Sequence, residues 1–161
     1  MEFQLHNGVH LGILLMTQVN SPSAAGFMLF KRFGDGYRVL CLYSNRDIGD
    51  IPKGRCDHSD VGLFHTAQRE CMEEASIFIS KSDLLTSEFL LLDSRLAIFC
   101  ATTNQDVEIK KNPASNKFEH ISHEWTSLEK LEKMVPNYLK PACSWAEIIL
   151  NQYLTLRAPD Y

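Results

Sequence analysis

The chain has 161 residues, of which 45% are hydrophobic and 22% are charged, and its formal net charge is −4 at pH 7. This length suits one domain with one hydrophobic core, and this composition excludes a disordered chain. No run of basic residues is longer than a pair such as Lys110-Lys111, so a long polyanion is not the expected partner. A small phosphorylated molecule would need only a local pocket.

The cysteines and the N-terminal segment bear on the location of the protein. An odd, unpatterned set of cysteines is typical of reduced thiols in a cytoplasmic or nuclear protein, where most act as small core residues. The segment Met1 to Asn7 lacks Lys and Arg, and the apolar run Leu11 to Met16 is too short to span a bilayer. We therefore expect a protein inside the cell, with no secretory signal and no membrane segment. The five cysteines are Cys41, Cys56, Cys71, Cys100 and Cys143.

The first part of the chain predicts strands. Residues 9–19 are expected to form a strand that ends at the break from Asn20 to Ser23. Residues 24–33 and 37–43 flank Gly34-Asp35-Gly36, and this pattern predicts a β-hairpin because Gly and Asp tolerate positive φ.

A loop and a helix follow the hairpin. Residues 46–60 are rich in Gly, Asp and Pro, and residues 61–75 carry an apolar stripe with helical spacing, with Asp60 or Ser59 as the expected N-cap. The order of strands, helix, strands and helices predicts an α+β fold or an α/β/α sandwich. The later elements are short strands at 77–79, 88–92 and 95–101, a strand within 115–125, and helices at 128–135 and 142–154.

One Arg and three Glu stand within the segment Arg69-Glu70-Cys71-Met72-Glu73-Glu74. On a helix, Glu70, Glu73 and Glu74 lie three and four positions apart, so their carboxylates crowd one face and repel. A divalent cation would offset the repulsion, because Mg²⁺ takes carboxylate oxygens and bridges to phosphates. An ordinary solvated acidic helix edge is the alternative. The cluster indicates a metal site that acts on phosphate.

Gly54 followed by Arg69-Glu70-x-x-Glu73-Glu74 resembles the Nudix box, G-x5-E-x7-R-E-U-x-E-E-x-G-U, where U is a bulky aliphatic residue. Pro52-Lys53 resembles the PKG opening of this box in several Nudix subgroups. Downstream, Glu119-His120-x4-Trp125 is similar to a segment of the dinucleoside tetraphosphate (Ap4A-type) hydrolases of the superfamily. The resemblance implies a Nudix-type α/β/α sandwich with a mixed central β-sheet.

The box departs from the family pattern in two places. The stretch from Gly54 to Arg69 is one residue longer, which puts Asp60 or Val61 at the position of the first Glu. We interpret Asp60 as its short substitute. Ser76 stands where the box has Gly, and some strain is expected there because a left-handed helix end favours Gly.

The resemblance assigns roles to the box. Glu70, Glu73 and Glu74 are expected to bind Mg²⁺, or Mn²⁺ as a substitute, and to act in catalysis. Arg69 lies four residues before Glu73 and can brace that carboxylate by an ion pair. The structural residues of the box would be Gly54, Asp60 and Arg69.

Residues outside the helix are further candidates. Lys53 would meet substrate phosphate, with a solvated lysine as an equal alternative. Glu119 matches a Glu that binds metal or activates water in the tetraphosphate hydrolases, and a plain loop charge is the other interpretation. Trp125 is expected to be a core residue rather than a base-stacking platform. His120 and His123 are expected to be surface histidines without a catalytic role.

The predicted function is that of a metal-dependent pyrophosphohydrolase acting on a nucleoside diphosphate-linked substrate, best a dinucleoside polyphosphate such as diadenosine tetraphosphate. The alternatives are an mRNA cap or diphosphoinositol polyphosphate hydrolase, and a catalytically weakened Nudix module that binds or regulates. The expected partner is a small phosphorylated nucleotide, with a capped RNA 5′ end as the alternative and no membrane.

The resemblance also implies a single Nudix hydrolase domain over residues 1–161, with the box at about 54–77. Gly49 occupies a position, five before Gly54, that is often aromatic in the tetraphosphate hydrolases, so a stacking partner for adenine is missing there.

Overall fold

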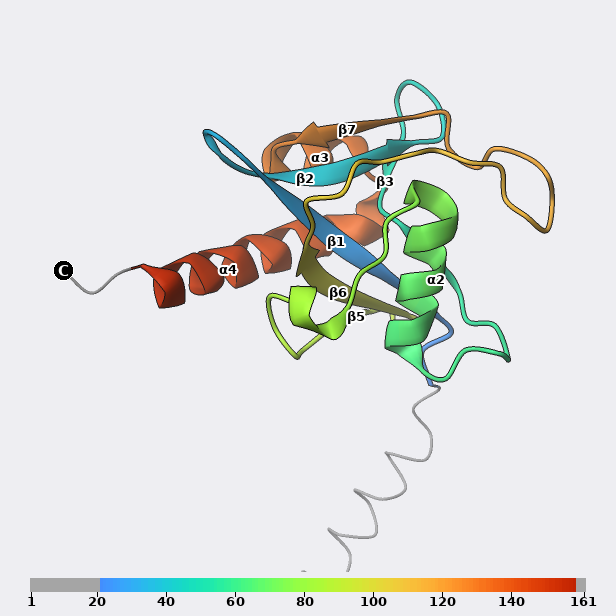
Figure 1. Ribbon diagram of the computed structural model, residues 1–161, viewed down its shortest axis with the longest axis horizontal. Coiled ribbons are helices and arrows are strands. Elements are labelled where there is room, and N and C mark those ends of the chain that lie inside the picture. The colour runs from blue at the N-terminus through green and yellow to red at the C-terminus, as the bar shows by residue number, and fades with distance from the viewer. Residues whose placement is uncertain (1–20, 159–161) are drawn as a thin grey trace, which may run out of the picture.

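The computed structural model describes residues 21–158, and the strand expected at residues 9–19 lies outside them. A mixed sheet of seven strands forms the centre of this part of the chain (Figure 1). The strands are β1 (Ala24–Phe33), β2 (Gly36–Tyr43), β3 (Gly49–Asp50), β4 (Lys53–Arg55), β5 (Leu90–Leu92), β6 (Leu96–Thr102) and β7 (Ser122–Thr126). The helices are α2 (Leu63–Ala75), α3 (Leu128–Met134) and α4 (Lys140–Arg157), with short 3-10 helices η1 (Lys81–Asp83) and η2 (Asn137–Leu139).

The predicted hairpin is confirmed, and it leads into the mixed sheet. Strands β1 and β2 pair antiparallel, with Phe33 opposite Gly36 at the turn, and Gly36 has a φ of 132°. Strand β1 then pairs parallel with β6, so the sheet order is β3-β2-β1-β6-β5. Strand β7 adds to β2, and β4 adds to β1.

Helices cover both faces of the sheet (Figure 1), and β1 and its neighbours are therefore buried on both sides. Successive side chains of a strand point to opposite faces. Phe27 accordingly joins the cluster of the α2 stripe, Ala67, Cys71 and Ala75, while Met28 joins the cluster that α3 and α4 cover. This arrangement confirms the predicted α/β/α sandwich.

Three local predictions are wrong. Residues 46–60, expected to be a loop, contain the short strands β3 and β4. Helix α2 begins at Leu63 with Gly62 as its N-cap, because the Asp60 carboxylate binds other side chains instead of the helix end. Residues 77–79 form no strand, because the backbone N–H and C=O of Phe78 both bond to the side chain of Gln105. Ser76 does take the expected left-handed conformation, with a φ of 58°.

Glycines let β4 lie between β1 and α2. Gly26 pairs with Lys53 across the β1–β4 ladder, and a Cβ at Gly26 would collide with the side chain of Lys53 and the carbonyl of Pro52. A Cβ at Gly54 would collide with the carboxyl group of Glu70. The Lys53-Gly54 corner is thereby held directly against the glutamates of α2.

Four of the five cysteines, all but Cys56, are buried, and none of the five is in a disulfide. Cys71 and Cys100 are core residues, as expected, and burial raises the pKa of each thiol to about 12. Within residues 21–158, no helix has the length and apolar character that a membrane span requires.

Candidate active site

The three glutamates of the box lie on the face of α2 that is turned toward β4. Glu70 and Glu74 are each 8% exposed, and Glu73 is half-buried. The backbone N–H of Lys53 donates to Glu74 Oε2 at 3.1 Å, which joins the helix to the β4 corner. The carboxylates are therefore not splayed into bulk solvent, as a plain solvated helix edge would be.

Burial disfavours the charged forms of the Glu70 and Glu74 carboxyl groups. It is the main reason that the pKa of Glu74 rises to about 9, and the nearby Asp50 carboxylate adds to the effect. Burial likewise raises the pKa of Glu70, against the opposing effect of Arg69. Each group would gain from a positive charge beside it, since removing a charge from water without a partner is costly.

This donor set fits a hard divalent cation, because oxygen ligands on one helix face are what Mg²⁺ takes. Within residues 21–158, however, no three His, Cys, Asp or Glu side chains are already close enough together to hold an ion. The guanidinium of Arg69 already engages two of the three glutamates: Nη1 donates to Glu70 Oε1 at 2.8 Å and to Glu73 Oε1 at 3.3 Å. An ion bound by these carboxylates would compete with Arg69 for their oxygens.

Arg69 is the centre of a network that includes Asp60. Its Nε and Nη2 donate to the two Asp60 oxygens at 3.0 Å each, and Nη2 also donates to the Arg55 carbonyl at 2.8 Å. These bonds from Arg69 hold the pKa of the Asp60 carboxyl well below its usual range. Asp60 also accepts from the Thr66 hydroxyl at 2.8 Å. Asp60 thus ties the long loop to α2.

Lys53, Asp50 and His120 form a second network of polar contacts, which the sequence did not reveal. Lys53 Nζ is 2.9 Å from Asp50 Oδ2, and His120 Nε2 is 3.4 Å from the same oxygen. Burial alone would raise the pKa of Asp50, but the bonds from His120 and Lys53 outweigh it and lower that pKa. His120 is 5% exposed, so its expected place on the surface is wrong. The acidic residue three positions before Lys53 was the available signal.

Glu119 does come close to the glutamates of the box. It lines a small cleft together with Glu73, Glu74 and His120, and it accepts a hydrogen bond from Asn112 Nδ2 at 2.8 Å. The cleft volume is about 10 Å³. This space suits roughly one water molecule or ion rather than a nucleotide.

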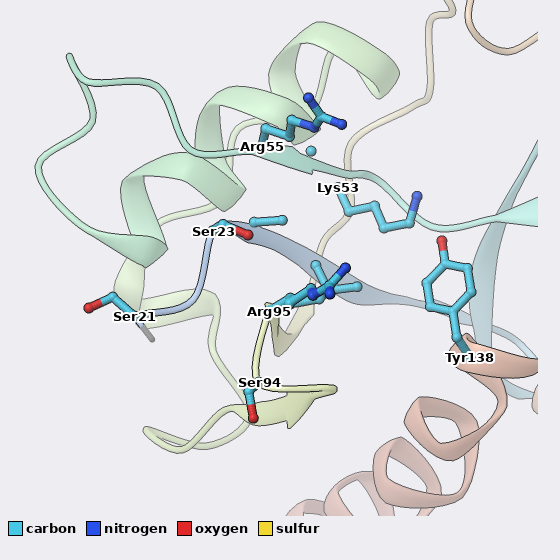
Figure 2. A pocket seen from close by; sticks show the side chains of 10 residues that line it. Ser21, Ser23, Lys53, Arg55, Ser94, Arg95 and Tyr138 are labelled. Atoms are coloured by element: carbon cyan, nitrogen blue, oxygen red, sulfur yellow. The ribbon is translucent and has the colours of Figure 1, made fainter. Parts of the chain in front are cut away.

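The large cavity beside the site is cationic (Figure 2). Its volume is about 760 Å³, and Lys53 and Gly54 are part of its wall, so it meets the glutamate face at Gly54. No carboxylate is found among the described residues that line it, which suits a phosphorylated ligand. The lining residues are Ser21, Ser23, Ala24, Lys53, Gly54, Arg55, Ser94, Arg95, Leu96 and Tyr138.

The remaining candidates pack elsewhere. Trp125 is half-buried against the core cluster under α2, its ring 6.3 Å from that of Phe33, and it is not a wall residue of the large cavity. His123 is exposed, as expected.

Comparison with known proteins agrees with the box and the fold. A family profile described as NUDIX domain matches residues 20–145. The chain is also 35% identical, over 98 residues, to an uncharacterized 17.7 kDa protein in the e-segB intergenic region of Enterobacteria phage T4. That match covers 61% of this chain and 54% of the phage protein, so the chain spans about half the length of this relative.

Three solved structures are similar in fold at low sequence identity. A Listeria monocytogenes protein assigned as a NUDIX hydrolase is 18% identical, with 83% of this chain and 97% of that chain covered and a TM-score of 0.60. The NUDIX domain of Shewanella oneidensis NrtR, solved with ADP ribose, is 16% identical, with 84% and 89% covered and a TM-score of 0.56. A C. elegans Ap4A hydrolase is 20% identical, with 83% and 97% covered and a TM-score of 0.51.

The family match spans most of the chain, including the α2 glutamates, the β4 corner and the central sheet. The chain therefore belongs to the NUDIX domain family.

Proposed function

We propose that the protein is a metal-dependent pyrophosphohydrolase that cleaves a nucleoside diphosphate-linked substrate, best a dinucleoside polyphosphate such as diadenosine tetraphosphate. The main support is one juxtaposition: the buried face of Glu70 and Glu74 meets Gly54 at the edge of a cationic cavity of about 760 Å³. The proposal takes residues 1–161 as a single Nudix hydrolase domain, and the family match supports the part from residue 20 to residue 145.

Glu70, Glu73 and Glu74 are the residues that would hold Mg²⁺, or Mn²⁺ as a substitute. The bound ion would supply the positive charge that neutralises phosphate oxygens and acidifies the attacking water. Arg69 limits the rotation of Glu70 and Glu73 and so orients them.

The chemical step breaks a bridging P–O bond. Water adds to one phosphorus, its proton passes to a carboxylate, and the other phosphate leaves with the bridging oxygen. Glu119 is our candidate for the proton acceptor, since it lines the cleft of about 10 Å³ with Glu73 and Glu74. Lys53 would bind substrate phosphate from the cavity wall, although its pairing with Asp50 neutralises part of its charge.

The choice of a dinucleoside polyphosphate rests on the cavity. An aromatic residue has no room at position 49, because a Cβ there would already crowd Cys41 Sγ and Met134 Cβ at 2.7 and 2.9 Å. Tyr138, which is 45% exposed and lines the cavity, offers an aromatic ring from η2 instead. A base could stack there rather than on β3.

The test is the release of mononucleotides from diadenosine tetraphosphate in Mg²⁺, compared between the wild-type protein and Glu73→Gln. We expect kcat to fall about a hundredfold or more in the variant, because a neutral amide is a weak ligand for a hard cation. Glu129→Gln, which changes an exposed carboxylate paired with Lys133 on α3, should leave the rate unchanged. Equal rates in the wild-type protein and Glu73→Gln would refute the proposal.

A binding or regulatory module is the second candidate, and the engagement of Glu70 and Glu73 by Arg69 favours it. A chain in which Arg69 retained both carboxylates would bind nucleotide without turnover. Isothermal titration of nucleotide and Mg²⁺, run beside a phosphate-release assay, separates the two candidates. Tight nucleotide binding without product in Mg²⁺ or Mn²⁺ would identify the module.

A further inference from the structure

The cavity beside the glutamates continues past Arg95 into a second space. This second cavity has a volume of about 440 Å³ and shares Arg95, Leu96 and Tyr138 with the cavity of about 760 Å³. Arg95 therefore stands where the two spaces meet. We propose that Arg95 is the specificity-determining residue of this groove and selects substrates with phosphates beyond the pyrophosphate that is cleaved. The inference rests on the proposed function of the same site.

The backbone of Arg95 is firmly held. It closes the turn from β5 to β6, in which Asp93 and Ser94 take left-handed φ values of 50° and 56°. The Arg95 N–H donates to the Leu92 carbonyl at 3.0 Å, and the Arg95 carbonyl accepts from the N–H groups of residues 23 and 24 at 2.8 and 3.0 Å. Two successive non-glycine residues in this conformation are costly, and the surrounding bonds keep them there.

The side chain of Arg95, in contrast, is available to a ligand. It is exposed, and within residues 21–158 no carboxylate forms an ion pair with it. Lys53, the other cation on this side of the cavity, is already paired with Asp50. Figure 2 shows the ends of Lys53 and Arg95 directed toward the region of the Tyr138 hydroxyl, while Arg55 points away from them. Arg95 is thus the stronger attractor for an anion in this part of the groove.

The chemistry of a guanidinium defines the ligand. Its planar fork binds phosphate with two parallel hydrogen bonds, and it remains charged at any physiological pH. Arg95 is absent from the cleft that Glu73, Glu74 and Glu119 line, so it would contact a phosphate away from the cleaved bond. The second cavity would then take the group attached to that phosphate. A pyrophosphate that ends in a neutral sugar, such as ADP-ribose, leaves Arg95 without its partner.

The experiment measures the equilibrium binding of two ligands to three proteins in Mg²⁺. All three proteins also carry Glu73→Gln, which slows turnover. The ligands are diadenosine tetraphosphate and ADP-ribose, and the proteins carry Arg95, Arg95→Gln or the control Arg32→Gln on β1. We expect Arg95→Gln to raise the Kd for diadenosine tetraphosphate about tenfold or more, since a charged phosphate contact is lost. The Kd for ADP-ribose should change less than about twofold, and Arg32→Gln should change neither.

The outcomes separate this inference from the proposed function. Equal effects of Arg95→Gln on both ligands, no effect on either, or no binding of diadenosine tetraphosphate at all would overturn the role of Arg95. Arg95→Gln could weaken the binding of diadenosine tetraphosphate alone while the protein with Glu73 intact hydrolyses none of it. That result would support the role of Arg95 and refute the proposed hydrolase activity. Arg95→Lys should restore part of the selectivity, and thermal unfolding should match across the variants because the side chain is exposed.

Discussion

Gly54 shows how one missing side chain can position a site. The carboxyl group of Glu70 occupies the space in which any Cβ at residue 54 would lie, and Gly54 is also part of the cavity wall. We expect Gly54→Ala to displace Glu70 and to lower kcat/KM about 10- to 100-fold, because a shift of about 1 Å at a reactive group is enough for such a loss. Steady-state kinetics in Mg²⁺ measures this. Gly34→Ala, where the new Cβ would meet nothing within 4 Å, is the matched control, and equal kinetics in both variants would contradict the account.

Asp50 is the second residue whose removal should be informative. Its Oδ2 lies 2.9 Å from Lys53 Nζ and 3.4 Å from His120 Nε2, and both of these side chains are largely buried. Asp50→Asn should lower the free energy of unfolding by about 1–3 kcal/mol, because it leaves a buried cation without its partner. Urea unfolding gives this value, with the exposed Asp47→Asn as control. A change in Asp50→Asn no larger than that of the control would show that the network does not contribute.

Contacts in the site between residues close in sequence were predictable, and contacts between distant residues were not. The Arg69–Glu73 contact was predicted, since four positions on one helix bring two side chains together. The Asp50–His120 contact joins residues that only the assembled sheet brings together, through the pairing of β2 with both β3 and β7. Nothing in the local pattern around either residue marks that contact.

Among the strands and helices, the position of β4 depends most on glycines, which have no side chain. Gly26 on β1 faces Lys53, and a Cβ there would collide with backbone atoms, which cannot rotate away. Gly26→Ala should therefore shift β4 and reduce the free energy of unfolding by about 1–3 kcal/mol, with activity falling as well. Chemical denaturation beside a kinetic assay checks both effects. Unfolding like that of Gly34→Ala would show that β4 adapts without loss.

Helices and turns were largely predictable where a short window of sequence carries the pattern that specifies them. The hairpin turn and the apolar stripes of α2, α3 and α4 each lie within a short window of sequence. Residues 77–79 have the composition of a strand, but the distant side chain of Gln105 takes the hydrogen bonds of Phe78 that a neighbouring strand would need. Competition of this kind is a tertiary effect that composition does not report.

For the whole molecule, the buried Glu74 links stability to pH. Its pKa is raised by burial from 4.5 to about 9, so the folded protein binds a proton that the unfolded chain releases between these values. The resulting stabilisation is complete below about pH 4.5 and is lost as the pH rises through about 9. Without metal, Tm should fall by several degrees from about pH 5 to about pH 9.

Two comparisons check this pH dependence. Saturating Mg²⁺ should raise Tm more at about pH 8 than at about pH 5, because the ion and the proton compete for the same carboxylate. Glu74→Gln should remove most of the slope in EDTA, since its amide does not titrate. Scanning calorimetry across this pH range measures both slopes. If Tm fell equally with pH in the wild-type protein and in Glu74→Gln, Glu74 would not be the cause of the pH dependence.

The proposed hydrolysis requires that the three α2 carboxylates bind a divalent cation, and Mn²⁺ binding followed by electron paramagnetic resonance measures this. The account predicts that the wild-type protein takes up Mn²⁺, that Mg²⁺ displaces it, and that Glu70→Gln and Glu74→Gln each weaken binding at least about tenfold. Glu129→Gln should bind as the wild-type protein does. Absence of Mn²⁺ uptake at millimolar ion, or equal uptake by all of these proteins, would contradict the account.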